Sequence, residues 1–489
     1  MSILLSREAG MTIVARNLGK RLRAYGAILL TLVLLPCLAT GQTGTPPPKR
    51  MTLDQALAYA LEHYPAVRAA LEQMSAARAG ITLARTQYLP LLNGVYQDSR
   101  ATENQVPGIW LPSPITPTVE GPVGPASGQS YWGSQAAMLF SWEPFDLGLR
   151  SATVGGAKSA ADKSSADLAV TRLQVATAVG DYFLTALANQ QARLAAQANL
   201  DRWKVFNKSV HVLAENQLRP GAEASRADAE LSRAKTQLYL AQQAEQVALD
   251  TLAALMGAAG SDIGVDSGPL LDPPPAASLP EAASSAHPLA RDEMAALRQV
   301  QAQEKVFERS DYPRFLLQAE GFGRGSEVPN NGTIIGDANG LAPARGNWVV
   351  GLTILFPDLF DLKALSAKKQ IAQAHERAQQ AHYQQTLQDL NGQILAARDQ
   401  LKAAQLVAQE TPTELRAARQ TEIQSRARYE AGLTNLVEVA EAENLLAQAE
   451  TQDALARLNL WRGLFHVAYA QGDLEPFLAA LHTQAGRRP

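Results

Sequence analysis

The stretch FDLGLRSA, residues 145–152, recurs as FDLKALSA at residues 360–367, an offset of 215 residues. Small and apolar residues further along the chain are repeated at the same offset. Ala227, Leu231, Ala234, Leu240 and Gly257 correspond to Ala442, Leu446, Ala449, Leu455 and Gly472. Because self-similarity at a fixed offset is the mark of a repeated architecture, we expect two parts of this chain to fold alike.

A second set of anchors precedes each of these stretches. Pro65 and Pro90 are 25 residues apart in the first half, and so are Pro288 and Pro313 in the second half. Two anchors in the same order indicate a duplicated chain. The predicted division is a first repeat (42–256), a Pro/Gly/Ala-rich linker (257–280), a second repeat (281–472) and a C-terminal tail (473–489).

Each predicted repeat reads helix, strand, strand, long helix and helix. The first contains a helix at 53–88, strands at 91–97 and 131–142, and helices at 147–216 and 222–256. The second contains a helix at 281–311, strands at 314–323 and 347–356, and helices at 361–429 and 434–471. The long helices would each be about 105 Å long at 1.5 Å per residue. In each repeat the two shorter helices, stacked end to end, would cover the long one. This geometry predicts a tall cylinder with strands at one end.

Small residues recur at helical spacing along the last helix of each repeat. Alanine and leucine alternate at steps of four and three from Ala227 to Ala241, and again from Val439 to Ala449. Such a narrow apolar stripe is typical of a coiled-coil seam, and its small residues let helices pack closely. The seam alone fits an ordinary helical bundle as well as a duct.

The four predicted strands have one apolar face and one mixed face. In the last strand Val350, Leu352, Ile354 and Phe356 alternate with Val349, Gly351 and Thr353; in the second strand Ala136, Met138, Phe140 and Trp142 oppose Gln135, Ala137 and Ser141; and in the third Phe315, Leu317 and Ala319 oppose Leu316, Gln318 and Glu320. This pattern suits a barrel wall between lipid and water, with Trp132 and Trp348 as candidate interface aromatics. Four strands cannot close a barrel with a lumen. Either the strands form a half-buried soluble sheet, or several chains each contribute four.

The N-terminus has the layout of a secretory signal peptide. Basic residues at 16–23 precede an apolar run at 27–35 and small residues at 39–41, so we expect residues 1–41 to be removed. Cys37, the only cysteine, is either an ordinary signal-peptide residue or a lipid-attachment cysteine; Pro36 before it fits lipid attachment poorly. No later apolar stretch is long enough for a transmembrane helix. The net charge of −3 and the lack of a basic cluster predict no nucleic-acid partner.

Two further motifs carry a family resemblance. TLDQAL at residues 52–57 is followed by Pro65, and ARYEAG at residues 427–432 leads into Val439-x-x-Ala442-Glu443-x-x-Leu446. With the duplicated layout, these resemble the TolC-type outer-membrane efflux protein family (outer membrane factors) over residues 51–472. The resemblance implies a mainly α fold with a membrane β-barrel. Three identical chains would build a 12-strand barrel on a long α-helical barrel, in the outer membrane of a Gram-negative type envelope and extending into the periplasm.

The same resemblance implies a passive exit channel for efflux or type I secretion. Its partners would be two further copies, a periplasmic adaptor (membrane fusion) protein, an inner-membrane transporter of the RND, ABC or MFS type, and outer-membrane lipid. It implies no cofactor, and the cargo is not readable from the sequence. The main rival is a periplasmic structural or adhesion protein built on coiled coils, whose strands would need no detergent.

The resemblance also assigns roles at the helix-hairpin tips. Arg219, Pro220 and Gly221 on one tip, and Gly432 and Thr434 on the other, would face the adaptor and form the periplasmic entrance. Glu438 and Glu441 match the residues that ring this entrance with carboxylates, although two solvated surface glutamates read the same way. Tyr429 matches a latch tyrosine. Its usual basic partner is Thr434 here, which leaves Arg219 and Arg428 as replacements.

No catalytic or metal-binding motif stands out. The chain lacks a Walker-type GxxxxGK[ST] and a GxSxG sequence, so an enzyme is not expected. His375 and His382 are seven residues apart and could share a helix face, but the favoured interpretation is two ordinary polar helix positions.

Overall fold

The computed structural model describes residues 47–102, 130–274, 283–327, 338–357 and 362–486. The predicted signal peptide at 1–41, including Cys37, lies outside the described residues. The helices are α2 (Leu53–His63), α3 (Pro65–Thr86), α4 (Leu149–Glu215), α5 (Gly221–Leu255), α6 (Pro288–Ser310), α7 (Leu362–Glu430), α8 (Leu436–Gln471) and α9 (Glu475–Ala485). The strands are β1 (Arg50–Met51), β2 (Leu91–Thr102), β3 (Ser130–Phe145), β4 (Gly264–Val265), β5 (Arg314–Ser326) and β6 (Arg345–Leu355). Short 3-10 turns are η1 (Gly268–Leu271), η2 (Ser284–Ala286) and η3 (Ala338–Leu341).

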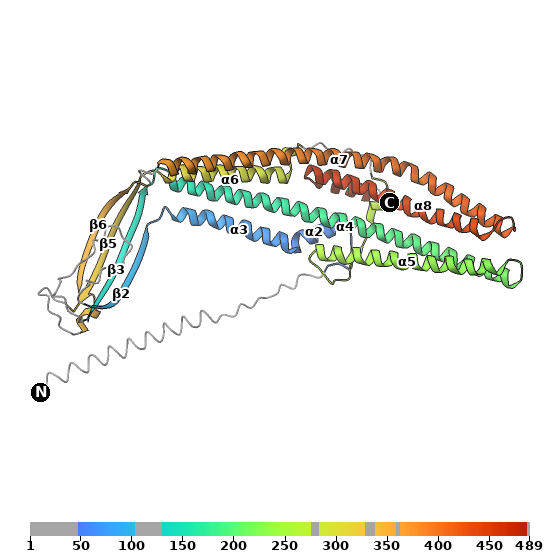
Figure 1. Cartoon of the computed structure of the whole chain (residues 1–489), viewed down its shortest axis with the longest axis horizontal. Coiled ribbons are helices and arrows are strands. Elements are labelled where there is room, and N and C mark those ends of the chain that lie inside the picture. Colours follow the sequence, from blue (N-terminus) through green and yellow to red (C-terminus); the bar gives the residue numbers. More distant parts are fainter. Residues whose placement is uncertain (1–46, 103–129, 275–282, 328–337, 358–361, 487–489) are drawn as a thin grey trace, which may run out of the picture. The chain divides into compact units, whose positions relative to one another are not determined.

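The order of elements occurs twice along the chain, as α2/α3, β2, β3, α4, α5 and as α6, β5, β6, α7, α8. On the sheet side α3, α4, α6 and α7 pack side by side in that order (Figure 1). Away from the sheet, α4 pairs with α5 and α7 with α8, and α4 packs on α8 to join the two hairpins. The long helices α4 and α7 have 67 and 69 residues, about 100 Å of helix each.

Two predicted helices are wrong, the first because it is broken in its interior and the second at its N-terminal end, and each difference falls at a proline. The helix predicted over 53–88 is divided at Tyr64, which adopts an extended ψ of 128° before Pro65. Proline disfavours the helical conformation in the preceding residue and lacks an N–H. The helix predicted from 281 begins only at Pro288, where the Nδ1 of His287 caps it by accepting a hydrogen bond from the Leu289 N–H.

The linker and the tail contain structure that the sequence pattern did not indicate. In the linker, Gly264 and Val265 form β4, which pairs in parallel with Arg50 and Met51. The predicted C-terminal tail contains helix α9, whose Phe477 is fully buried. These short elements depend on packing against distant parts of the chain rather than on their own periodicity.

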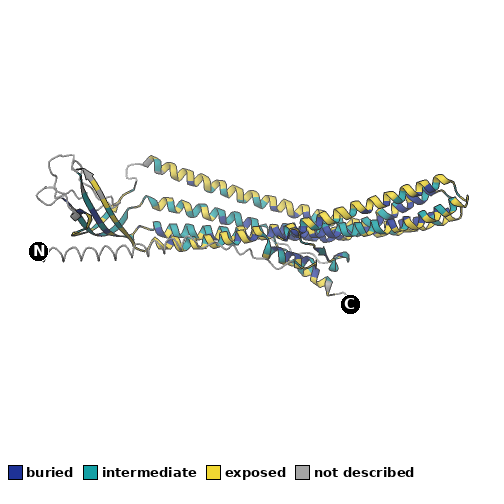
Figure 2. Cartoon of the chain, turned by 90° about the horizontal axis from the view of Figure 1, so that it is seen from below, coloured by how far each residue is buried: buried dark blue, intermediate teal, exposed yellow. Residues whose placement is uncertain are grey.

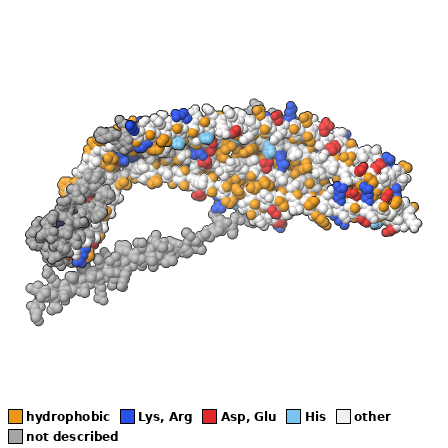
Figure 3. Space-filling model, in the orientation of Figure 1, with side chains coloured by type: hydrophobic (Ala, Val, Ile, Leu, Met, Phe, Trp, Pro, Cys, Tyr) orange, Lys and Arg blue, Asp and Glu red, His pale blue; other side chains and the backbone are white. Residues whose placement is uncertain are grey.

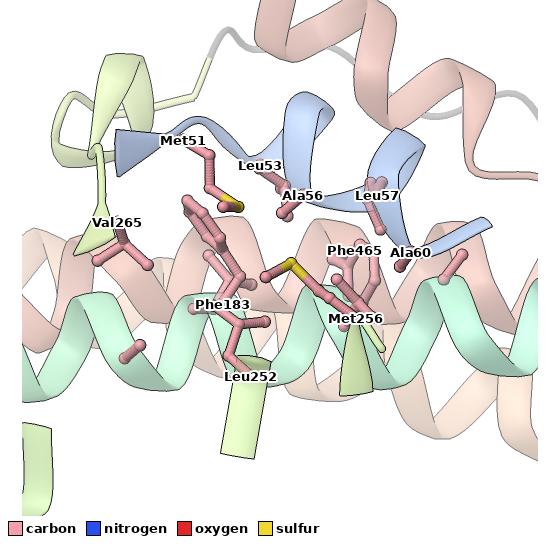
Figure 4. Close-up of a cluster of buried hydrophobic side chains, with 14 of the residues drawn as sticks. Met51, Leu53, Ala56, Leu57, Ala60, Phe183, Leu252, Met256, Val265 and Phe465 are labelled. Atoms are coloured by element: carbon pink, nitrogen blue, oxygen red, sulfur yellow. The ribbon is translucent and has the colours of Figure 1, made fainter. Parts of the chain in front are cut away.

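Buried residues concentrate in the middle of the helical part and along the paired hairpins (Figure 2). The helices beside the sheet, notably α3 and α7, are largely exposed. Figure 4 shows the main core, in which side chains from six elements point toward one another. Its labelled members include Met51, Leu53, Ala56, Leu57, Ala60, Phe183, Leu252, Met256, Val265 and Phe465.

One position of this core must be glycine because another side chain packs directly against its backbone. A Cβ built on Gly180 of α4 would lie 2.3 Å from the ring of Phe465 of α8, and that ring is fully buried. We expect Gly180→Ala to lower the free energy of unfolding by about 1–3 kcal/mol, because an overpacked core must shift. The matched control is Gly155→Ala on the same helix, where a Cβ meets no atom within 4 Å. It should stabilise the helix by up to about 1 kcal/mol. Thermal unfolding followed by circular dichroism measures both, and equal melting temperatures would contradict the packing.

Strands β2, β3, β5 and β6 form one antiparallel sheet in that order. Register places Met138 between Gly94 and Gly321, and Gly321 opposite Trp348. Side chains alternate between faces along a strand, so the three predicted apolar sets share one face of the sheet. This face carries Leu92, Tyr96, Ala136, Met138, Phe140, Trp142, Phe315, Leu317, Ala319, Trp348, Val350, Leu352 and Ile354. The other face is mixed: Asn93, Gln97, Gln135, Ser141, Gln318, Glu320, Asn347 and Thr353 share it with the apolar Leu91, Val95, Ala137, Leu139, Leu316 and Val349.

Candidate functional site

The tips of the two hairpins meet through Arg219 and Tyr429. Arg219 follows α4, and its guanidinium lies 4.4 Å from the ring centroid of Tyr429 at the end of α7. Its Nη2 donates a hydrogen bond to the Tyr429 carbonyl at 2.6 Å, and its Nη1 donates to the Thr434 carbonyl at 3.3 Å. These carbonyls lie at the C-terminal end of α7 and in the turn that follows it, so one side chain ties that tip to the neighbouring hairpin.

The side chain of Tyr429 is buried, with 1% of its surface exposed. Its hydroxyl donates a hydrogen bond to the Glu223 carboxylate of α5 at 2.8 Å. Burial, followed by this bond to a carboxylate, raises the pKa of Tyr429 to about 12. The hydroxyl therefore stays protonated and keeps donating across the physiological range.

The backbone at the tips is built for tight turns. Gly432 has a φ of +76°, which favours glycine, and Asn435 caps α8 by accepting from the backbone N–H groups of Val437 and Glu438. On the other tip Pro220 is the N-cap of α5 and accepts from the Glu223 N–H at 2.9 Å. Gly221, which follows it, is exposed, and a Cβ there would meet no atom within 4 Å.

The two candidate entrance glutamates have different surroundings. Glu438 is half-buried, accepts a hydrogen bond from the Thr434 hydroxyl, and forms an ion pair with Arg428 at 3.3 Å. Glu441, one turn further along α8, is exposed. A single chain brings these two carboxylates to one helix but cannot form a ring.

The tip residues rest on an apolar cluster shared by both hairpins. It contains Leu200, Trp203, Phe206, Val210, Ala227, Ala234, Leu238, Tyr429, Leu436, Val439 and Ala440. Ala227, Ala234, Leu238 and Val439 are residues of the predicted seam, and the structure confirms that they pack between helices. The tips therefore rest on packed apolar side chains from both hairpins.

The sheet is the second candidate surface. Its apolar face includes large side chains that no part of the described chain covers, among them Trp348, which is 79% exposed. From Ala136 to Phe145 β3 spans ten residues, about 33 Å of strand. Tilted by about 40°, this covers about 25 Å, the height of the apolar band of a membrane barrel. Within the described residues the outer edges of β2 and β6 pair with no other strand.

The fold and these surfaces match a known family. A family model for the outer membrane efflux proteins matches residues 56–258 and 279–464, which is most of the chain. This chain belongs to that family. The expected resemblance to TolC-type outer membrane factors is therefore confirmed, and it places this efflux protein in the outer membrane, extending into the periplasm.

Solved structures share the fold of this efflux protein at low sequence identity. The outer membrane protein VceC of Vibrio cholerae is 17% identical, with a TM-score of 0.66 over 86% of this chain and 96% of VceC. The open-state outer membrane channel MtrE of Neisseria gonorrhoeae is 20% identical, with a TM-score of 0.67 over 86% and 89%. The outer membrane channel CmeC of Campylobacter jejuni is 17% identical, with a TM-score of 0.66 over 88% and 89%. None of the proteins with curated descriptions matches the sequence.

The sequence pattern missed one functional candidate of this efflux protein, a charge network below the tips. Glu443 of α8, with 1% exposed, accepts from the Nε of Arg202 of α4 at 2.9 Å and pairs with Arg426 of α7. Arg202 also pairs with Glu450 at 3.1 Å, and Arg426 with Glu422 at 2.8 Å. The network thus joins α4 to the α7/α8 hairpin.

Burial raises the pKa of Glu443, because the ionised carboxylate loses its contact with water there. A signal existed in the sequence, because Glu443 stands inside the apolar stripe of Val439, Ala442 and Leu446. A charge in such a stripe is buried only if it is paired. Figure 3 shows the resulting concentration of Lys, Arg, Asp and Glu side chains at the hairpin end.

Two absences hold within the described residues. No group of three or more His, Cys, Asp or Glu side chains there could hold a metal ion. Likewise, none of the described helices combines the length with the hydrophobicity needed to cross a membrane.

Proposed function

We propose that three copies of this protein form the outer-membrane channel of a tripartite efflux or type I secretion system. The continuous apolar face across β2, β3, β5 and β6 is the observation that carries this proposal, together with the family. A sheet of four strands cannot enclose a lumen, whereas twelve strands can. The open edges of β2 and β6 are where neighbouring chains would pair.

The channel would be a passive exit duct. An inner-membrane transporter of the RND, ABC or MFS type would supply the energy, and a periplasmic adaptor would connect it to the hairpin tips. The exposed tip residues Pro220, Gly221 and Gly432 form the surface proposed for the adaptor. Export to this membrane also fits the proposed signal peptide at 1–41, which contains Cys37.

Family membership and the apolar sheet face favour this channel over a periplasmic coiled-coil scaffold. Reconstitution of the purified protein into planar lipid bilayers tests the channel function. Discrete conductance steps are expected. A protein that enters detergent micelles as a trimer and yet never conducts, with or without a tip variant, would overturn the proposed duct.

We expect the entrance ring to depend more on Glu441 than on Glu438. Under threefold symmetry each glutamate forms a ring of three carboxylates, and such rings raise the local cation concentration. Glu438 already pairs with Arg428 and Thr434, whereas Glu441 is exposed. Glu441→Gln should therefore lower the cation-to-anion permeability ratio by about twofold or more, and Glu438→Gln by less. Reversal potentials in a salt gradient measure both, and two unchanged ratios would remove the ring assignment.

A further inference from the structure

An open groove lies between α4 and α6 at their sheet ends, with a volume of about 670 Å³. One wall is the start of α4 and the other is the second half of α6. The lining residues used below are Gly155 and Ser159 of α4 and Arg298, Lys305 and Arg309 of α6. The groove is separate from the hairpin tips and from the charge network around Glu443.

Three cations line the α6 wall. Arg298 and Lys305 are seven residues apart and Arg309 follows four residues later, so all three share one helix face. Glu308 is the lining acid, which leaves an excess of positive charge in the groove. Among the described contacts, Arg298 and Lys305 have neither a hydrogen bond nor an ion pair, whereas Arg309 donates to the Leu147 carbonyl at 3.3 Å. Like charges four residues apart on a helix repel, so the groove favours an anion.

The α4 wall keeps this space open. It presents Ser151, Ala152, Gly155 and Ser159, whose side chains are small and partly hydroxylated. A Cβ on Gly155 would meet no atom within 4 Å, so no contact within the chain requires a glycine there. Helices α4 and α6 are the inner members of the row α3, α4, α6, α7. The groove therefore does not lie at an outer edge of the row, where a second copy of the chain would pack.

The groove begins where the sheet ends. Leu147 and Gly148, two of its lining residues, follow β3, whose last residue Phe145 is 69% exposed. Leu147 and Tyr312 beside it are also exposed, and Tyr312 stacks on the Arg309 guanidinium at 5.1 Å. Exposed aromatic side chains beside a cation such as Arg309, with further cations along the same helix face, are typical of a membrane–water boundary.

We propose that this groove binds the phosphate of a phospholipid headgroup at the periplasmic boundary of the membrane. The inference rests on the proposed function for the position of that boundary. Arg298 and Lys305 supply the positive charge, Ser151 and Ser159 supply hydroxyl donors, and the acyl chains extend along the apolar strands. Phosphate oxygens accept charge-assisted hydrogen bonds from such groups.

The test is native mass spectrometry of the detergent-purified assembly with added phosphatidylglycerol. The wild type should retain the lipid, and Arg298→Gln with Lys305→Gln should weaken retention at least about tenfold, since two charged contacts are lost. Gly155→Leu, which fills the groove, should do the same. The matched controls are Lys208→Gln with Lys402→Gln, which remove two exposed cations elsewhere, and Gly392→Leu, at another open helical glycine.

Further measurements in the same experiment distinguish a lipid phosphate from free inorganic phosphate. Diacylglycerol, which lacks phosphate, should be retained no better by the wild type than by the double variant. Equal retention of phosphatidylglycerol by wild type and both groove variants would overturn the site, as would complete displacement of the lipid by millimolar inorganic phosphate. Because the oligomer mass is read in the same spectrum, failure of the proposed channel assembly is distinguished from failure of the lipid site.

Discussion

Arg202→Met should lower the free energy of unfolding by about 3 kcal/mol, the largest loss of stability we expect from a single substitution. Arg202 pairs with Glu443 and Glu450, and its removal leaves the buried Glu443 with Arg426 as its remaining cation. Removing one partner from a buried ion network typically costs about 3–5 kcal/mol, because a buried charge loses compensation. The lower end of this range applies here, since Arg426 still pairs with Glu443. Denaturation of the detergent-solubilised protein, followed by circular dichroism, measures the loss.

The sign of the pH dependence separates this cause from a simple packing defect. Burial raises the pKa of Glu443 above its usual range, and loss of Arg202 should raise it further. An acid whose folded-state pKa is raised destabilises the fold when ionised, and this penalty disappears as the pH falls and the acid protonates. The stability gap between wild type and Arg202→Met should therefore narrow on acidification. A gap that widens or stays constant would contradict the account.

Removing the acid should rescue the variant. Glu443→Gln in the Arg202→Met background should restore most of the lost stability, because the buried side chain that lost Arg202 is then uncharged. The control Arg226→Met removes an exposed arginine of α5 and should change stability by no more than about 0.5 kcal/mol. The network would then be a link between the α4/α5 and α7/α8 hairpins.

Arg219→Ala should raise the conductance of the resting channel about tenfold or more in planar bilayers. Arg219 donates two hydrogen bonds, one to the end of α7 and one to the turn that follows it, and stacks on Tyr429. If the tips form the entrance, loss of these contacts frees the α7/α8 hairpin. Hydrogen bonds from a charged group contribute about 1.5–3 kcal/mol each, and every 1.4 kcal/mol shifts an equilibrium tenfold.

Graded variants make the latch assignment specific. Arg219→Lys keeps the charge but loses the planar stacking and the paired donors, so it should give an intermediate conductance. Tyr429→Phe removes only the bond to Glu223 and should have the smallest effect. Arg428→Gln is the matched control, because Arg428 pairs with Glu438 rather than with Tyr429. If Arg428→Gln raised the conductance more than Arg219→Ala, the latch would be Arg428, and the assignment to Arg219 would be wrong.

The long helices and the strand faces could be predicted because their signals are local. The two long helices predicted at 147–216 and 361–429 differ from α4 and α7 by at most two residues at either end. The alternation around Met138, Leu317 and Leu352 predicted which side chains share a face, and the observed register brings these three strands together on it.

The rest depends on contacts between distant residues. Nothing in the local pattern shows that Phe477 of α9 packs on the core, or that Gly264 pairs with Arg50. Arg219 and Arg428 were equal candidates for the latch in the sequence. Only the turn geometry directs Arg219 to Tyr429 and Arg428 to Glu438. Pairing across helices also decides that Glu443 is buried while Glu441 is exposed.

The most direct test of the proposed channel is the mass of the purified particle. Membrane fractionation, detergent extraction and multi-angle light scattering should give an outer-membrane protein that requires detergent and contains three chains. Such a particle has twelve strands and can enclose a lumen. A water-soluble monomer would contradict the account, because the apolar face of β2, β3, β5 and β6 would then face water.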